Sequence, residues 1–333
     1  MKNKKIVILL LLFLLPVSGC VFPGFNPSDS KTPPQTGVLI EDFSPDFQNV
    51  RSGEEVKFLL KVKNAGSVKA ENGFAELLGI DQVWLNAQKT DISKTGEVFP
   101  DEEYCRYNAN KKITLLPEDL EAGTTGGGTT CTWKYVAPPV SAGLSIHSKP
   151  MARFYYSYNT STVKTITIAS REELKSFEEQ GKPLPSESYS KTKSPISIDV
   201  ETSTPIRTYT NKVEFPIVIT IKNVGGGAVC MGNSVDCKKP GGTEKNDNWN
   251  KFNLIINLPT GLSLSEGSCT SKEMIVLVGN DPQMISCRIT AVISQQIGVA
   301  QKNIEVTAGY GYFIDKTTDV YVYPSSEPVP ASG

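Results

Sequence analysis

The sequence predicts an all-β protein that consists of two tandem β-sandwiches. Three observations support this fold class: apolar and polar residues alternate along short segments, clusters of Gly, Pro and Asn separate these segments, and a similar series of segments occurs twice. Such alternation is typical of strands with one buried and one exposed face. The chain of 333 residues is long enough for two domains of ordinary size.

The N-terminal residues have the pattern of an export signal. Lysines near the start of the chain precede the unbroken apolar run Ile6–Leu15. This run is too short to cross a bilayer as a helix, which favours a signal peptide over a membrane span. Val17–Gly19 and then Cys20 follow, and this ending resembles the lipobox of bacterial and archaeal lipoproteins. The resemblance implies cleavage before Cys20, a lipid on its thiol and attachment to the extracytoplasmic face of the cell membrane. An ordinary secretory signal with an incidental cysteine is the alternative.

The remaining cysteines form three neighbouring pairs along the chain. Because an exported protein meets oxidising conditions, we expect disulfide bonds. Pairing between neighbours is favoured, although the sequence leaves other connectivities open. A metal site is the weaker alternative, since the sequence has no CxxC spacing and His147 is its only histidine. The expected pairs are Cys105–Cys131, Cys230–Cys237 and Cys269–Cys287.

The strand-like segments fall into two similar series. Lys61–Gly66 of the first series matches Thr220–Gly225 of the second, and Tyr156–Tyr158 matches Tyr310–Tyr312. The same landmarks flank a cysteine pair in each series, so we expect one type of domain to occur twice. The expected strands cover residues 56–62, 132–135, 152–158 and 163–168 in the first series, and 213–221, 252–258, 304–312 and 320–323 in the second.

The segment between the two series has the start and stop signals of a short helix. Ser170 and Glu173 have capping-box spacing, and Gly181 can end the helix. A helix is therefore favoured over a disordered acidic stretch, and a linker that contains Pro and Ser follows it. The expected division is residues 1–19 for the signal peptide, 20–36 for the lipidated cysteine and a tether, 37–169 for the first sandwich, 170–194 for the helix and linker, 195–324 for the second sandwich, and 325–333 for a flexible tail.

Each series contains a strand that ends in Lys-Asn-x-Gly, at Lys63–Gly66 and at Lys222–Gly225. This motif resembles the cell-adhesion-related (CARDB-like) and related immunoglobulin-like domains of archaeal and bacterial surface proteins. The resemblance implies an immunoglobulin-like β-sandwich and a location in the cell envelope, and it implies no catalytic residues. The physical reason that we expect for the motif is local, because Asn tolerates unusual backbone angles and Gly supplies a positive φ.

The sequence shows no recognisable catalytic constellation. His147 is the only histidine and is interpreted as an exposed residue at a strand end. The glycine runs at residues 126–128 and 225–227 lack the Lys and the following helix of a phosphate-binding loop. Asp101–Glu103 are consecutive carboxylates that splay apart instead of facing each other across a cleft. We therefore expect no enzymatic activity, no cofactor and no metal. With 34 basic and 35 acidic residues, the chain also lacks the basic excess typical of nucleic-acid binding.

The long loop over residues 225–250 is the best candidate for a binding surface. The expected bond between Cys230 and Cys237 would restrain this loop and reduce the entropy lost on binding. Trp249 is either an exposed aromatic residue of this loop or the start of the next core strand. Calcium binding by residues 246–250 is a weaker alternative, because the Gly and distal Glu of an EF-hand loop are absent. The candidate binding residues are Met231, Asn233, Asp247 and Trp249.

Residues Asn159–Ser161 form a glycosylation sequon. We expect Asn159 to lie in a surface turn between two strands. An unmodified hairpin tip is the equally favoured alternative.

These features favour a lipid-anchored structural or adhesive module of the cell surface. Its expected partners are the membrane, through the lipid at Cys20, and envelope proteins or glycans. One alternative is a subunit of a surface filament or secretion assembly that uses strand edges for contacts. Another is a solute-binding lipoprotein, which is disfavoured because such proteins usually have α/β lobes with many helices. The tandem domains favour an archaeal source over a bacterial one.

Overall fold

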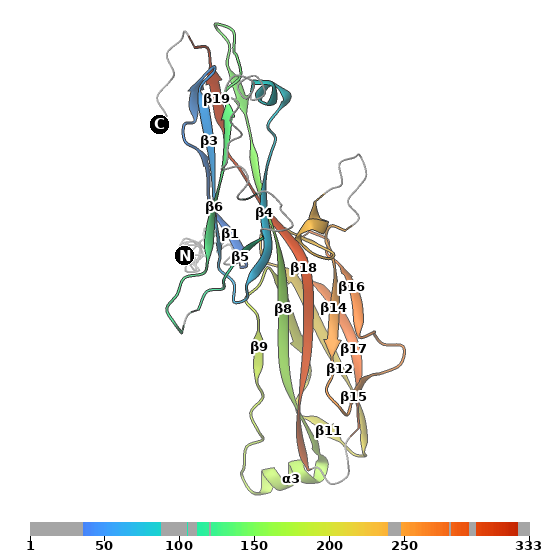
Figure 1. Cartoon of the computed structure of the whole chain (residues 1–333). Helices are drawn as coiled ribbons and strands as arrows, with labels where there is room; N and C mark the ends of the chain where they lie inside the picture. Colours follow the sequence, from blue (N-terminus) through green and yellow to red (C-terminus); the bar gives the residue numbers. More distant parts are fainter. Residues whose placement is uncertain are drawn as a thin grey trace, which may run out of the picture. The chain divides into compact units, whose positions relative to one another are not determined.

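The computed structural model describes residues 36–87, 105, 112–119, 121–238, 248–279, 281–292 and 298–325. Strands make up most of these residues and form four sheets (Figure 1). The predicted all-β, sandwich-like class is therefore confirmed. Cys20, Asp101–Glu103 and Asp247 lie outside the described residues, so the structure does not bear on the predictions made for them.

The first half of the chain forms a sandwich-like layer pair. One sheet has the order β1 (Val38–Pro45), β3 (Glu55–Asn64), β6 (Gly128–Val136). In β3, every second residue from Val56 to Asn64 is buried, as the alternation predicts. The facing strands are β4 (Ala70–Leu78) and β8 (Met151–Ser170), whose inner residues belong to the same hydrophobic core.

The second half repeats this arrangement. One sheet has the order β10 (Ile196–Glu201), β12 (Lys212–Asn223), β17 (Gln283–Val292), β15 (Leu262–Leu264). It faces the strands β16 (Lys272–Val276), β14 (Lys251–Asn257) and β18 (Val299–Thr317). The shorter elements are β2 (Asn49–Arg51), β5 (Ile113–Leu115), β7 (Ile146–Ser148), β9 (Tyr189–Lys191), β11 (Ile206–Thr208), β13 (Ala228–Cys230), the 3-10 helix η2 (Ser234–Cys237) and β19 (Val320–Tyr323), and residues 82–87 are helical.

Two long strands connect the halves in a way that the sequence does not reveal. All 19 residues of β18 pair with β8, from Val299 opposite Ala169 to Thr317 opposite Met151. β4 pairs with the start of β8, and β14 pairs with Glu305–Gly309 in the middle of β18, so the two paired long strands have neighbours from both halves. The final strand, β19, pairs with β2 and β7 of the first half. Residues Gln35–Gly333 accordingly form one compact unit with one main hydrophobic core.

The predicted helix is present as α3 (Arg171–Glu179). The Ser170 side chain accepts a hydrogen bond from the backbone N–H of Glu173 at 3.1 Å, as its capping position predicts. Gly181 follows with φ of 64°, a left-handed conformation that favours glycine. The helix directly follows β8, and the chain then returns through β9, which pairs with β8 (Figure 1). This segment therefore lies beside the shared sheet.

The repeated Asn-x-Gly motif has a structural role different from the one expected. Asn64 donates to the carbonyls of Val68 at 2.8 Å and Leu115 at 3.1 Å, and its amide oxygen accepts from the N–H of Gly66 at 3.0 Å. Asn223 makes the matching bonds to the carbonyl of Gly227 and from the N–H of Gly225. Neither asparagine nor its following glycine has a positive φ. The glycines are required for space, because a Cβ on either one would collide with a tyrosine hydroxyl.

These tyrosines form a second repeated feature, which we call the tyrosine junction: Tyr156, Tyr158, Tyr310 and Tyr312. Tyr156 lies opposite Tyr312, and Tyr158 lies opposite Tyr310, where β8 and β18 pair. All four side chains are buried. Their hydroxyls accept hydrogen bonds from the backbone N–H groups of Val38, Val68, Ile196 and Gly227 respectively. The junction thus ties the first strand and the Asn-x-Gly turn of each half to the shared sheet.

Candidate functional site

The three predicted disulfide pairs are present. Sulfur–sulfur bonds join Cys105 to Cys131, Cys230 to Cys237, and Cys269 to Cys287, with Cα atoms 5.3–5.5 Å apart. Such Cα distances are typical of disulfide bonds. The first and third bonds each attach a loop to a strand of a sheet, β6 or β17. The second bond closes a short loop that leads into η2.

The described part of the loop predicted to bind partners covers one face of the shared sheet, and its binding role stays a prediction. Asn233 caps η2: its side chain accepts from the N–H of Val235 at 2.9 Å, and its own N–H donates to Asp236 at 2.7 Å. Ser234 donates through its hydroxyl to the carbonyl of Asn72 at 2.8 Å. Met231 is half-buried. We call residues 230–238 together with Trp249 the disulfide lid.

Trp249 is a packing residue of this lid. Its ring is half-buried and lies 4.9 Å from that of Phe313. The indole N–H donates to the carbonyl of Cys237 at 2.8 Å. These contacts hold Trp249 in the lid, and its role in partner binding stays a prediction. The residue closes a small core that is separate from the main one.

A partly exposed charge pair lies under the lid: the Arg153 side chain is 13% exposed and that of Asp315 is 31% exposed. The Arg153 guanidinium makes two hydrogen bonds of 2.6 Å to Asp315 and lies 4.1 Å from the centre of the Phe313 ring. Burial opposes the charge of Arg153, but its hydrogen bonds with Asp315 outweigh this effect and raise the pKa of the guanidinium. Burial, with the Glu76 carboxylate nearby, raises the pKa of Tyr155 to about 12. These groups are mutually satisfied, which indicates a structural role.

Asn159 does not lie in a turn, which corrects the expectation for this residue. It occupies the middle of β8, opposite Gly309 of β18, and its side chain is exposed. The turn prediction was wrong because it relied on Asn, Thr and Ser, which are common in loops. The long pairing with β18 holds these residues in an extended strand. The glycosylation hypothesis for Asn159 stays a prediction.

His147 is exposed, as interpreted from the sequence, but it is the middle residue of the three-residue strand β7 and does not lie at a strand end. Its Nε2 atom lies 2.7 Å from the Asp319 carboxylate, and its ring stacks on Tyr321 at 4.4 Å. Within the described part of the chain, no group of three metal-ligating side chains occurs, and no helix is long and apolar enough to cross a membrane.

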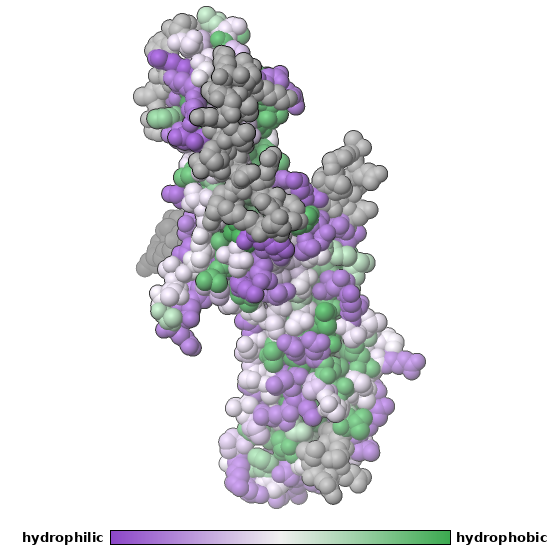
Figure 2. All heavy atoms as spheres, in the orientation of Figure 1, coloured by the Kyte–Doolittle hydropathy of each residue, from purple (hydrophilic) through white to green (hydrophobic). Residues whose placement is uncertain are grey.

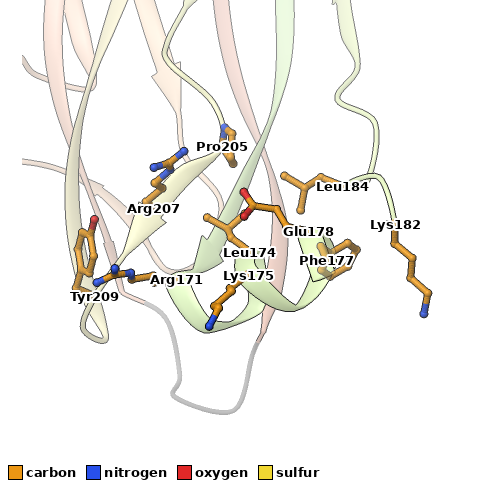
Figure 3. A pocket seen from close by; sticks show the side chains of 10 residues that line it. All are labelled: Arg171, Leu174, Lys175, Phe177, Glu178, Lys182, Leu184, Pro205, Arg207 and Tyr209. Atoms are coloured by element: carbon orange, nitrogen blue, oxygen red, sulfur yellow. The ribbon is translucent and has the colours of Figure 1, made fainter. Parts of the chain in front are cut away.

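A concave surface among the described residues is a groove of about 680 Å³ between α3 and β11 (Figure 3). The helix contributes residues from one face. Every second residue from Pro205 to Tyr209, in and beside β11, also lines the groove. Ile206 and Thr208 between them are buried on the opposite side. We call this site the α3 groove. Its lining residues are Arg171, Leu174, Lys175, Phe177, Glu178, Lys182, Leu184, Pro205, Arg207 and Tyr209.

The α3 groove is cationic and partly apolar. Four of its lining side chains are basic and one is acidic. Lys175 pairs with Glu179 at 3.5 Å on the helix surface, whereas Arg171, Lys182 and Arg207 form no ion pair with any described residue. Tyr209 is 74% exposed. In the view of Figure 3, Arg171 and Arg207 lie toward the end of the groove that contains Tyr209, and Phe177 and Leu184 lie toward the other end.

Sequence reasoning missed this groove, although part of its signal is in the sequence. Arg171, Leu174, Lys175 and Glu178 have the spacing of one helix face. Arg207 and Tyr209 lie far along the chain, and only the parallel pairing of β11 with β8 brings them to α3.

Comparison with known proteins finds no protein family that matches this chain. A search of curated proteins likewise finds no match.

Proposed function

We propose that the protein is a lipid-anchored module of the cell surface that binds envelope proteins through non-covalent contacts and performs no catalysis. The export signal and the cysteine of the lipobox-like ending support the anchor. Three disulfide bonds support an oxidising, extracytoplasmic location. The repeated sandwich-like halves support the resemblance to immunoglobulin-like surface domains.

The observation that carries the binding role is the α3 groove. Its volume of about 680 Å³ is within the range of ligand-binding clefts. Six of its ten lining side chains come from α3 and β11, and β11 is paired to the shared sheet. Because these elements are held in place before binding, docking to the groove would cost less conformational entropy than docking to a flexible loop, which must first become ordered.

The test uses the full-length tagged protein in cells that make lipoproteins. We expect the wild type in the membrane fraction, accessible to protease on intact cells and crosslinked to envelope proteins. Mass spectrometry should find a mature N-terminus at a lipid-modified Cys20. The Cys20→Ala variant should leave the membrane fraction. A wild-type protein that is retained in the cytoplasm, or one that reaches the surface but crosslinks to no envelope protein, would refute the proposal.

One observation favours a second function, that of a subunit in a surface filament or secretion assembly. Strand β16 lies at an edge of the largest sheet, and Met274 and Val276 on it are exposed by 60% and 43%. Ile255 on the neighbouring β14 and Val278 just beyond β16 are exposed as well. Figure 2 shows hydrophobic side chains scattered among hydrophilic ones over the half of the molecule that contains these strands. Exposed edges of this kind can pair with another chain.

Analytical ultracentrifugation separates this function from the first. A filament subunit should self-associate as its concentration rises, and Met274→Lys should weaken that association. A protein that stays monomeric at high concentration would leave only the binding module.

A further inference from the structure

We infer that the α3 groove binds a short acidic peptide segment of another protein, in which carboxylates flank an apolar side chain. This inference rests on the proposed binding function and names the chemistry of its partner. Three properties of the groove lead to it: unpaired arginines, an apolar lining on a helix that has no buried residue, and a concave surface.

The unpaired arginines define the charge of the ligand. Arg171 and Arg207 have no acidic partner among the described residues, and both are exposed at the groove. A guanidinium binds a carboxylate through two parallel hydrogen bonds, which a lysine cannot do. The only carboxylate in the lining is that of Glu178, so the groove attracts anions. Two separate arginines fit a ligand with more than one carboxylate.

The apolar lining defines the second part of the ligand. None of the nine residues of α3 is buried, although Leu174 and Phe177 belong to the groove lining. A helix this short is marginally stable in water and depends on packing of its apolar face. Leu184 and Pro205 extend the apolar lining. An apolar side chain of the ligand would therefore complete the packing that the protein itself leaves unfinished.

The shape and composition of the groove favour a peptide over other anions. A concave site does not fit the flat surface of a bilayer, on which protruding basic and apolar residues would be needed. The lining contains no Asn, Gln or Asp side chain to hydrogen-bond the hydroxyl groups of a neutral sugar. An extended peptide can present carboxylates and an apolar side chain at alternating positions, which matches the mixed lining.

The binding test uses fluorescence anisotropy with the full-length protein in detergent and three labelled synthetic peptides. The first alternates Glu with Leu, the second alternates Glu with Ser, and the third alternates Lys with Leu. We expect the Glu/Leu peptide to bind at least tenfold more tightly than the other two, with affinity that falls as salt rises. The double variant Arg171→Glu/Arg207→Glu should weaken its binding at least tenfold.

A matched control reverses the same amount of charge outside the groove. Lys222 and Arg288 are exposed on β12 and β17 and do not line the groove, so Lys222→Glu/Arg288→Glu should bind as the wild type does. The variant Arg171→Lys/Arg207→Lys keeps the charge and should bind with intermediate affinity, because it loses the forked geometry. Circular dichroism should show that all variants are folded.

Several results would overturn the inference. These are no binding of the Glu/Leu peptide, equal binding of the Lys/Leu peptide, or wild-type affinity in the Arg171→Glu/Arg207→Glu variant. Tighter binding to phosphatidylglycerol vesicles or to polygalacturonate than to the Glu/Leu peptide would replace the peptide with a membrane or a glycan. Crosslinking in cells distinguishes a failure of the peptide inference from a failure of the proposed binding function. If Arg171→Glu/Arg207→Glu still crosslinks to the wild-type envelope partners, the binding module stands and the groove is not its site.

Discussion

The substitution Asn64→Ala tests whether the two halves unfold as one body. The Asn64 side chain is fully buried and takes part in three hydrogen bonds, of 2.8, 3.1 and 3.0 Å. Each intramolecular hydrogen bond contributes about 1 kcal/mol net, and its loss leaves a buried backbone group unpaired at a further cost. We therefore expect the free energy of unfolding to fall by about 3–5 kcal/mol.

The measurement is unfolding in guanidinium with the disulfide bonds intact. Circular dichroism and tryptophan fluorescence monitor the transition. Because β8 and β18 pair along their whole shared length, we expect one cooperative transition. Asn64→Ala in the first half and Asn223→Ala in the second should both shift this single transition to lower denaturant concentration. The exposed neighbour Lys61, changed to Ala, is the control and should change stability by less than about 0.5 kcal/mol.

Two results would refute this reasoning. Separate transitions, of which Asn64→Ala shifts only one, would show that the shared sheet does not couple the halves. A loss of less than about 1 kcal/mol would show that the hydrogen bonds of the Asn-x-Gly turn are replaced by water or by other groups.

Three further outcomes are expected. Gly311→Ala should cost about 1–3 kcal/mol and speed hydrogen exchange in the disulfide lid, because the new Cβ would collide with a lid carbonyl and with the sulfur of Cys237. Gly309→Ala, which meets only a side-chain amide oxygen, is the control and should leave lid exchange unchanged. Arg153→Ala should lower stability by about 1–2 kcal/mol in thermal melts, because it removes the guanidinium from the Phe313 and Trp249 rings and from the partly exposed Asp315 carboxylate. Burial raises the pKa of every tyrosine in the junction, to about 12 for Tyr158, so above pH 10 the unfolded chain loses protons that the folded chain keeps. Stability should therefore be insensitive to these groups below about pH 9 and fall by about 1.4 kcal/mol per pH unit for each tyrosine above pH 10, and Tyr158→Phe should reduce this slope in pH-dependent denaturation.

The features predictable from the sequence are those set by neighbours along the chain. The alternation in β3 predicts its buried face, because side chains in a strand point alternately to opposite sides. The spacing of Ser170, Glu173 and Gly181 predicts the ends of α3 for the same local reason. The neighbouring cysteines predict three disulfide bonds because short loops close readily in an exported protein.

The features missed depend on which strands pair. Alternation in β8 shows which side chains are buried, but it does not identify β18 as the partner, since many strands share that pattern. The α3 groove requires Arg207 to pair next to the end of β8, and the packing of Trp249 requires Phe313 beside it. These contacts are long-range, and no local propensity encodes them. The exposed Asn159 shows the converse, because its loop-like neighbours are held in a strand by a distant partner.

The two faces of the shared sheet restrain the halves in complementary ways. On one face the tyrosine junction binds the turns of both halves, and on the other the lid of the second half contacts the first half, where Ser234 bonds to Asn72 and Ser157. Glu71 and Cys230 occupy equivalent places, opposite Ser157 and Gly311, so the lid is an insertion that only the second half carries. Gly311 leaves the space that the inserted chain fills. Because contacts on both faces of the shared sheet restrain the two halves, binding in the α3 groove would not have to suppress motion between them. The entropy cost of binding would then be limited to the groove and the partner.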